Sequence, residues 1–387
     1  MMRSGNVAFT VAVLLAYIMQ GSIWYTMPFI FSRVLTNNYF AVGLLIALIP
    51  LIELLSAVPF GFLADFGRIK TIAFDSMLAI LLVPFLFATN INLLIAVGAF
   101  LLGAGGMGIW IAVTVHMANT MGKNVRFIGY EFAVMAVGWI TGPILGGFVY
   151  GNYGTLPLTT IEMLFLAISS FLFLKTMNYA SDTTYRRTPK FSKLLSVKDG
   201  LLGRIPKSAL PLFLLSFMLS FLTYAVWLAV PLLTHIGDVN LLIGGIVVGV
   251  IEVPYFFGDA LGGRLYKHAN KKNFVGYSML LSAAFIFIAT SLLSASYYSL
   301  TILFVSGLLI TLSQTGMFSA LVSTDKRDAG EICAISSVFG GFGGAISSVI
   351  TGATVAQYGL WVFAAVFGFM AVLYFVYLQL AFRKTDF

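Results

Sequence analysis

Twelve long apolar runs, separated by short polar gaps, constrain this chain more than any other feature of its sequence. A helix needs about 20 apolar residues to cross the hydrocarbon core of a bilayer. Only helices and closed barrels span lipid, because every backbone N–H and C=O there must be paired within the protein. The runs show no alternation of period two, so they predict helices. They are approximately Val7–Ser32, Phe40–Leu63, Thr71–Ala88, Asn92–Thr120, Phe127–Tyr150, Leu156–Met177, Ser208–His235, Leu241–Leu265, Asn273–Ser294, Tyr297–Ser323, Ala329–Ala356 and Leu360–Phe382.

Composition excludes the soluble and the disordered alternatives. Of the 387 residues, 60% are hydrophobic and only 9% are charged, and the mean hydropathy is +0.99. Soluble domains are roughly 45–50% apolar and about 25% charged. Disordered chains combine low hydrophobicity with high charge density. We therefore expect an all-α polytopic membrane protein with little chain left outside the bilayer.

The basic residues indicate how the chain crosses the membrane. If the N-terminus is placed inside, all of the 22 Lys and Arg residues except Arg33 fall on the inner side. Cytoplasmic loops are the ones enriched in Lys and Arg. We expect a multi-pass protein of the cell membrane with both termini cytoplasmic. The net charge of +8 then reflects topology, and we expect no nucleic acid as a partner.

Residues that carry enzymatic or metal chemistry are sparse. Cys333 is the only cysteine, and His116, His235 and His268 lack metal-ligand spacing. No His-Glu-x-x-His string or paired intramembrane Asp supports an intramembrane enzyme. No Gly-x-x-x-x-Gly-Lys-Ser/Thr loop supports ATP binding. We expect no enzymatic activity, no metal and no cofactor, with a non-transporting sensor or scaffold as a rival class.

The chain also looks like a duplication. The one long polar stretch, 179–207, separates an N-terminal six-helix half, 1–178, from a C-terminal six-helix half, 208–387. Parallel repeats with a site between them are typical of transporters. The residues that recur are Trp24 and Pro28 as Trp227 and Pro231, 203 later; Gly43 as Gly244, 201 later; and Gly138, Gly147, Tyr153 and Gly154 as Gly343, Gly352, Tyr358 and Gly359, 205 later.

Two motifs stand out in the first half. The fifth run holds Gly138-x-x-x-Gly142-Pro143-x-x-Gly146-Gly147. Small residues four apart allow close helix packing, and a proline bends the helix by removing a backbone hydrogen bond. The loop after the second run reads Gly61-Phe-Leu-Ala-Asp65-Phe-Gly67-Arg68-Ile-Lys70. Asp65 can lie at the start of the third helix or pair with a basic residue, although ordinary flanking charge also accounts for the loop.

These motifs resemble those of the major facilitator superfamily. The glycine string is similar to the fifth-helix signature of its proton-coupled drug and metabolite exporters. The loop is similar to Gly-x-x-x-Asp-Arg-x-Gly-Arg-Lys, with a shorter Asp-to-Gly spacing and no Arg after Asp65. The resemblance covers essentially the whole chain and implies twelve helices in two pseudo-symmetric halves. The gating or hinge candidates are Gly61, Asp65, Arg68, Gly138, Gly142, Pro143, Gly146 and Gly147.

In one respect the chain departs from these exporters. They commonly carry an Arg in the fourth helix, but His116 is the only basic residue between Asn92 and Thr120 here. The departure keeps an importer or facilitator as an alternative.

The resemblance further implies that the first, fourth, seventh and tenth helices line a central cavity. Their middles supply aromatic rings with polar edges, two amides and no fixed cation, which suits amphipathic or weakly polar ligands. A dianionic substrate would normally be met by a cation. The expected substrate-binding residues are Tyr17, Gln20, Trp24, Tyr25, Trp110, Tyr224, Trp227, Ser313 and Gln314.

Ionisable residues at membrane depth are costly and therefore candidates for function. Glu53 and Glu252 lie near the middle of their runs and are the proton-coupling candidates, with a neutral acid in helix packing as the alternative reading. Glu162 is shallower and is expected to be structural. Glu131 and Asp75 lie near the inner surface and are expected to be surface or gate charges. His116 lies at a similar depth and is expected to be an interfacial histidine with satisfied hydrogen bonds, with a proton carrier as the alternative.

The sequence as a whole predicts a secondary active transporter that works by alternating access. We expect a monomer in the lipid bilayer that uses protons to export amphipathic or small organic compounds. The alternative is an importer or facilitator for a sugar, an organic acid or another metabolite.

Overall fold

The computed structural model describes residues 4–65, 67–121, 125–176, 210–265, 275–284, 307–309, 329–358 and 361–381, and every regular element in these ranges is a helix. The short ranges 275–284 and 307–309 are helical throughout. The longer helices are α1 (Ser4–Val34), α2 (Tyr39–Asp65), α3 (Ile69–Ala88), α4 (Asn92–Met121), α5 (Val125–Tyr153), α6 (Thr155–Thr176), α7 (Leu210–Ile236), α8 (Leu241–Leu265), α11 (Ala329–Tyr358) and α12 (Trp361–Ala381).

The ends of these helices lie within three residues of the predicted bounds. Two of the helices end at glycines whose backbone lies in the left-handed region of φ and ψ. Gly154 has a φ of 82° directly after α5, and Gly67 has a φ of 75° after α2. A glycine adopts this conformation without the steric penalty of a Cβ and commonly ends a helix. The predicted connection at 179–207, and most of the ninth and tenth runs, lie outside the described residues.

The helices are long and apolar enough for a membrane. Within the described residues, eight of them meet both criteria for a span, and Leu241–Pro254, Val275–Ala284 and Ala364–Leu380 are shorter apolar helices. Many outward-facing side chains are also apolar, such as Leu55, Phe171 and Phe369. Such a surface fits a protein surrounded by lipid, where apolar side chains need not be hidden.

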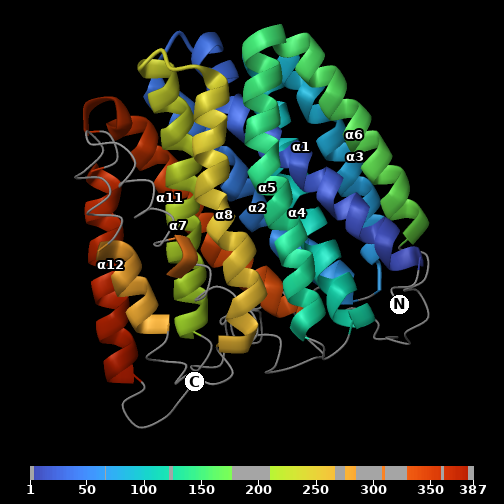
Figure 1. Ribbon diagram of the computed structural model, residues 1–387, viewed down its shortest axis with the longest axis vertical. Coiled ribbons are helices and arrows are strands. Elements are labelled where there is room, and N and C mark those ends of the chain that lie inside the picture. The colour runs from blue at the N-terminus through green and yellow to red at the C-terminus, as the bar shows by residue number, and fades with distance from the viewer. Residues whose placement is uncertain are drawn as a thin grey trace.

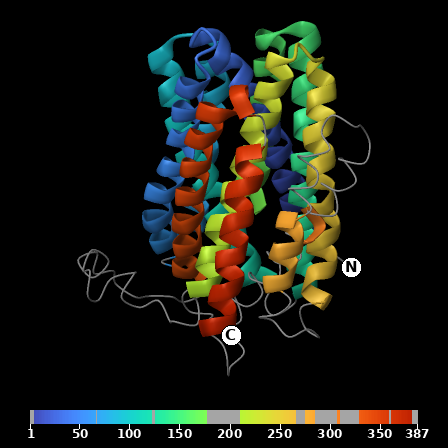
Figure 2. The ribbon, with the colours of Figure 1, turned by 90° about the vertical axis from the view of Figure 1, so that its left-hand side faces the viewer.

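The helices run side by side along the long axis of the molecule (Figures 1 and 2). The start of α1 and the end of α12 lie at the same end of the bundle, which we call the proximal end. The opposite, distal end holds the short turns from α1 to α2 and from α7 to α8.

Among the described helices, two pairs make the most extensive contacts between the first six helices and the later ones. Helix α2 packs along α11, and α5 packs along α8. Within each part, α1 packs on α5 and α7 packs on α11. The same pattern therefore occurs twice, as the duplication predicts.

Glycines separated by 205 residues make equivalent contacts. Gly138 of α5 packs against Tyr17 and Ile18 of α1, and its counterpart Gly343 of α11 packs against Phe217 and Phe221 of α7. A side chain at either position would collide with the partner helix, because a Cβ on Gly138 would lie 2.6 Å from the Cβ of Tyr17. The duplication read from the sequence thus corresponds to a pseudo-symmetry in packing.

A second pair of glycines repeats the pattern across the two halves. Gly147 meets Leu241 at the start of α8, and its counterpart Gly352 meets Tyr39 at the start of α2. Both contacts lie at the distal end. Equivalent glycines therefore allow the backbones of the two halves to approach closely there.

Candidate substrate cavity

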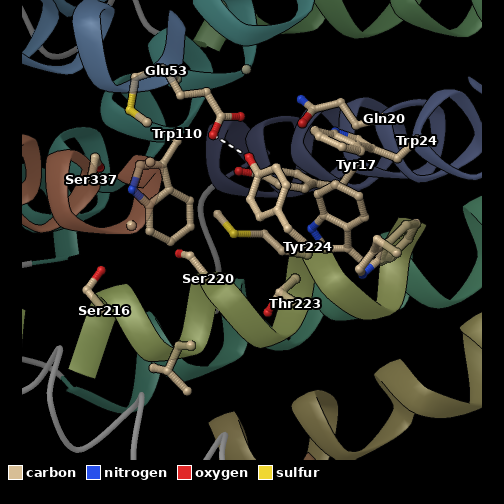
Figure 3. A pocket seen from close by; sticks show the side chains of 18 of the residues that line it. Tyr17, Gln20, Trp24, Glu53, Trp110, Ser216, Ser220, Thr223, Tyr224 and Ser337 are labelled. Atoms are coloured by element: carbon tan, nitrogen blue, oxygen red, sulfur yellow. Dashed lines mark hydrogen bonds between the residues drawn. The ribbon is translucent and has the colours of Figure 1, made fainter. Parts of the chain in front are cut away.

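A cavity of about 320 Å³ lies between the two halves, and its lining residues extend from the middle of the bundle towards the proximal end. Figure 3 shows side chains that line it. Helices α1, α2, α4, α5, α7, α8 and α11 all contribute to its wall. Its size is within the range of about 300–1,000 Å³ that is common for small-molecule sites. The cavity is therefore large enough for an organic molecule rather than a bare ion.

Aromatic rings form much of the wall. Trp24 and Tyr224 meet edge to face with centroids 5.2 Å apart, and Trp139 and Trp227 do so at 4.9 Å. Each of these pairs joins a helix of the first half to α7. Tyr17 lies 5.9 Å from Trp139, so the rings extend around α1, α5 and α7. Such rings offer apolar faces together with hydroxyl and indole N–H groups.

Two glutamates also reach the cavity, and each accepts a hydrogen bond from α7. The Tyr224 hydroxyl donates to Glu53 Oε2 at 2.5 Å, and the Trp227 indole Nε1 donates to Glu252 Oε1 at 2.7 Å. Residues three apart share a helix face, so one face of α7 holds both carboxyl groups. The bond to Glu53 joins the two halves (Figure 3), whereas the bond to Glu252 remains within the second half.

Hydroxyl groups gather at the proximal side of the wall, on α7 and α11. Ser216 donates to the backbone carbonyl of Ser336 at 2.8 Å, and the Ser336 hydroxyl donates to Ser216 Oγ at 3.1 Å. These side chains were not among the expected site residues. A stripe of small hydroxyl residues on a membrane helix is equally common in helix packing, so the sequence alone does not single them out. The hydroxyl residues on the wall are Ser216, Ser220, Thr223, Ser336 and Ser337.

Most of the expected substrate-binding residues line the same cavity. Tyr17, Gln20, Trp24, Trp110, Tyr224 and Trp227 all form part of its wall. Tyr25 does not, because its side chain is fully buried and its hydroxyl donates to the carbonyl of Leu241 at 2.6 Å. Ser313 and Gln314 lie outside the described residues.

The wall includes helices that were not expected there. The resemblance placed only the first, fourth, seventh and tenth helices around the cavity, but α2, α5, α8 and α11 contribute as well. Trp139 of α5 is the main aromatic residue that was missed. Its signal in the sequence is its place inside the glycine string, directly after Gly138, where a tryptophan stands between the glycines that pack on a neighbouring helix.

The other ionisable candidates whose side chains are described do not line the cavity. Glu162 is buried between α6 and α1 and accepts a hydrogen bond from Ser22 at 2.7 Å. The buried ring of His116 packs 4.5 Å from the ring of Phe9. Asp75 is exposed on α3, and the side chain of Glu131 lies outside the described residues. Among the described groups, Glu53 and Glu252 are the carboxyls that reach the wall.

The glycine string of α5 serves two interfaces. Gly138, Gly142 and Gly146 face α1, and a Cβ on Gly146 would lie 2.9 Å from Ser22 Oγ. On the other side of α5, the carbonyl of Pro143 meets Gly245 of α8. The string therefore joins α5 both to its own half and to the other half.

The loop motif after α2 is only partly described. Gly61 is buried and Arg68 is exposed. The N-cap position of α3 is Arg68, so Asp65 ends α2 rather than capping α3. The side chain of Asp65 lies outside the described residues.

Close contacts between the halves close the cavity on its distal side. Gly43 packs against Gly352, where a Cβ on Gly43 would lie 2.8 Å from the Gly352 Cα. In the distal turns, His235 Nε2 and Asn37 Oδ1 lie 3.1 Å apart. The cavity lies on the proximal side of all these contacts, so in this conformation the distal end is the closed one.

Comparisons with known proteins agree with the fold. The family model described as Major Facilitator Superfamily matches residues 9–347. An uncharacterised MFS-type transporter of Schizosaccharomyces pombe is 24% identical over an alignment of 258 residues, and the match covers 58% of this chain and 56% of that protein. The match thus spans about half the length of that relative.

Solved structures match over nearly the full length. The human organic anion transporter MFSD10 has a TM-score of 0.76 at 14% identity, with 98% of this chain and 100% of that chain covered. The Escherichia coli fucose:proton symporter FucP has a TM-score of 0.69 at 15% identity, with 98% and 99% covered. At such identities the likeness shows the fold alone, and the predicted all-helical, two-half architecture is confirmed.

Proposed function

The chain belongs to the major facilitator superfamily, a family of membrane transporters rather than enzymes, and we propose that it exports amphipathic or small organic compounds in exchange for protons. Glu53 and Glu252 carry this proposal, because both place a carboxyl group on the wall of the cavity between the halves. Each group accepts a hydrogen bond from a ring of α7, Glu53 from Tyr224 and Glu252 from Trp227.

A carboxyl group on the wall of the cavity can link proton binding to the conformation of the protein. Burying an ionised carboxylate is expensive unless it is paired, whereas a protonated acid is much cheaper to bury. A cavity that is alternately wet and closed therefore favours proton release in one state and proton retention in the other. The Glu53 to Tyr224 bond crosses the halves, so movement of the halves changes the surroundings of Glu53 directly.

Alternating access supplies the movement. The distal end is closed by α2 on α11 and by α5 on α8, and the cavity lies on the proximal side. Together with the expected cytoplasmic termini, this conformation would load substrate from the cytoplasm. The opposite state requires those two helix pairs to separate distally while the proximal ends approach each other.

Proteoliposomes with an imposed pH gradient test the proposal. The purified chain should concentrate a compound from a mixed panel of drugs, sugars and organic acids against its gradient. Glu53→Gln with Glu252→Gln should abolish this uphill movement but spare downhill exchange, since glutamine keeps the shape and cannot carry the proton. Glu162→Gln, at a buried glutamate away from the cavity, is the matched control and should keep uphill movement.

One result would contradict the coupling role of both residues. If the double variant still concentrates substrate in response to pH, neither glutamate carries the coupling proton. The alternative function would then gain support.

The alternative is an importer or facilitator for a hydroxylated metabolite. The hydroxyl residues on α7 and α11 favour it, because they offer hydrogen bonds that suit a sugar. Flux of a sugar down its own gradient, unaffected by pH, would establish this function instead.

A further inference from the structure

We propose that Tyr25 is a latch that holds the distal end closed on one side of the bundle, where α1 and α5 of the first half meet α8 of the second. The inference rests on alternating access, but it needs neither a coupled proton nor a particular substrate. Three observations carry it: the position of the Tyr25 hydroxyl, the glycines that make room for it, and the residue at the equivalent position of the other half.

Tyr25 reaches from the first half into the second. Its side chain is fully buried, and its hydroxyl donates to the backbone carbonyl of Leu241 at 2.6 Å. Leu241 is the first residue of α8. Phe29, one turn further along α1, packs edge to face on the Tyr25 ring with centroids 5.4 Å apart. Separation of the halves at the distal end has to break the hydrogen bond, so the bond favours the closed conformation.

Two glycines make room for this side chain. A Cβ on Gly244 of α8 would collide with the Tyr25 hydroxyl and would lie 2.6 Å from Thr234 Oγ1. A Cβ on Gly147 of α5 would lie 2.5 Å from the Leu241 carbonyl oxygen and 3.1 Å from Tyr25 Cε1. A larger residue at either position would therefore push apart the two groups that form the hydrogen bond.

The space beside Gly244 differs from the space beside its counterpart in the first half. Gly43 lies 201 residues earlier, in α2, and a Cβ there would lie 2.7 Å from the Ser348 carbonyl oxygen and 2.8 Å from the Gly352 Cα. Gly43 thus lies directly against the backbone of α11. The space beside Gly244 holds a side chain of the other half instead, the hydroxyl end of Tyr25.

The residue equivalent to Tyr25 accounts for this difference. Trp24 recurs as Trp227, 203 residues later, so the position equivalent to Tyr25 is Leu228 of α7. A leucine side chain cannot donate a hydrogen bond. The bond that Tyr25 makes across the halves therefore has no equivalent at Leu228, and the two sides of the closed distal end are held together differently.

Pulsed electron paramagnetic resonance tests the latch by measuring the balance between open and closed distal ends. Spin labels are attached to Ile91→Cys and Val239→Cys of the purified full-length chain, in a Cys333→Ser background. These two residues are 54% and 43% exposed and lie in distal turns of different halves. In Tyr25→Phe, the ratio of the long-distance to the short-distance population should rise about fivefold, as expected for the loss of one hydrogen bond between neutral groups.

Thr26→Val is the matched control. Thr26 is the next residue of α1, and its buried hydroxyl donates to the Ser22 carbonyl of the same helix at 2.9 Å. This variant loses a bond within one helix, so its distance ratio should stay that of the parent chain. An unchanged ratio in a folded Tyr25→Phe variant, or an equal rise in Thr26→Val, would overturn the proposal.

Gly244→Ala tests the same contact from the side of α8, and it serves also where Tyr25→Phe does not fold. Its methyl group would collide with the Tyr25 hydroxyl, so the distance ratio should rise. In combination with Tyr25→Phe the methyl group meets no hydroxyl, so the two effects should be less than additive. No rise in Gly244→Ala, or fully additive effects, would show that the hydroxyl does not hold the distal end closed.

The distance measurement needs no pH gradient and no substrate, so the latch and the proposed export can fail separately. A raised ratio in Tyr25→Phe, in a protein that moves no solute in response to pH, would support the latch and overturn proton-driven export. Uphill, pH-driven transport with an unchanged ratio in Tyr25→Phe would do the reverse.

Discussion

Tyr224 is the residue through which the two halves meet at the centre of the molecule. Its ring packs on Trp24 of α1 and its hydroxyl donates to Glu53 of α2, although it belongs to α7. The ring contact and the hydrogen bond can be separated by substitution. A substitution can therefore remove the hydrogen bond to Glu53 and keep the packing of the ring on Trp24.

Tyr224→Phe should therefore weaken coupling more than folding. A hydrogen bond to a charged group contributes about 1.5–3 kcal/mol, so its loss should lower pH-driven transport by about tenfold or more. Proton and substrate fluxes measured in the same vesicles give the change in coupling. Tyr277→Phe is the control, since Tyr277 is 53% exposed. Equal coupling in both variants would show that the Glu53 bond has no part in transport.

Glu162 raises a question of stability instead. It is buried and accepts a hydrogen bond from Ser22 of α1, away from the cavity. Ser22→Ala removes that donor from a buried carboxyl and should lower the free energy of unfolding by about 1–3 kcal/mol. Thermal unfolding in detergent measures the effect. Ser170→Ala removes only a bond to Leu166 of the same helix and should be milder; a larger loss there would contradict the expectation.

At the scale of the helices, α2 and α11 form a close distal contact between the halves. Gly352 lies so near α2 that a Cβ would come 2.6 Å from the Tyr39 carbonyl and 2.7 Å from the Gly43 Cα. Two glycines of the α5 string do not lie between the halves, because Gly142 and Gly146 face α1 within the same half. Leu at either of those two positions would therefore disturb packing within one half before it affects motion between the halves.

Gly352→Leu should oppose distal closure while still allowing membrane insertion. Overpacking costs about 1–3 kcal/mol, which shifts the equilibrium between the two conformations by about fivefold to 150-fold. Cross-linking of Asn37→Cys to His235→Cys, in a Cys333→Ser background, measures distal closure and should fall. Gly368→Leu on α12, where a Cβ would meet nothing within 4 Å, is the control. Unchanged cross-linking in Gly352→Leu would show that this contact does not limit closure.

At the scale of the whole molecule, the two ends of the bundle differ in charge. Arg33 is the one basic residue expected on the outer side, and its guanidinium lies 5.4 Å from the centre of the Tyr150 ring at the distal end. Arg68 lies in the proximal turn between α2 and α3. The expected topology thus makes the proximal end cytoplasmic.

Cysteine labelling tests this orientation. In a Cys333→Ser background, a membrane-impermeant reagent should label Asn37→Cys on intact cells. Arg68→Cys should react only after the cells are opened, because its turn lies at the other end of the bundle. Labelling of Arg68→Cys from outside would reverse the orientation, and the cavity would then face the exterior.

The sequence by itself determined the helical architecture and the family. Runs of about 20 apolar residues admit only one kind of structure in lipid, so the helix bounds follow from composition and from glycine turns such as Gly67 and Gly154. The internal repeat is also visible in the sequence, because several of the recurring glycines lie at helix contacts. A Cβ at Gly147 or Gly352 would collide with the backbone of the neighbouring helix.

Only the tertiary structure decided which side chains share the cavity. Tyr25 and Trp24 are neighbours in the sequence, but one is buried against Leu241 and the other lines the wall. A helix in lipid is apolar on every side, so its periodicity does not distinguish the face towards the core from the face towards lipid. The pairing of Glu53 with Tyr224, 171 residues apart, and the closure of the distal end depend on how whole helices pack.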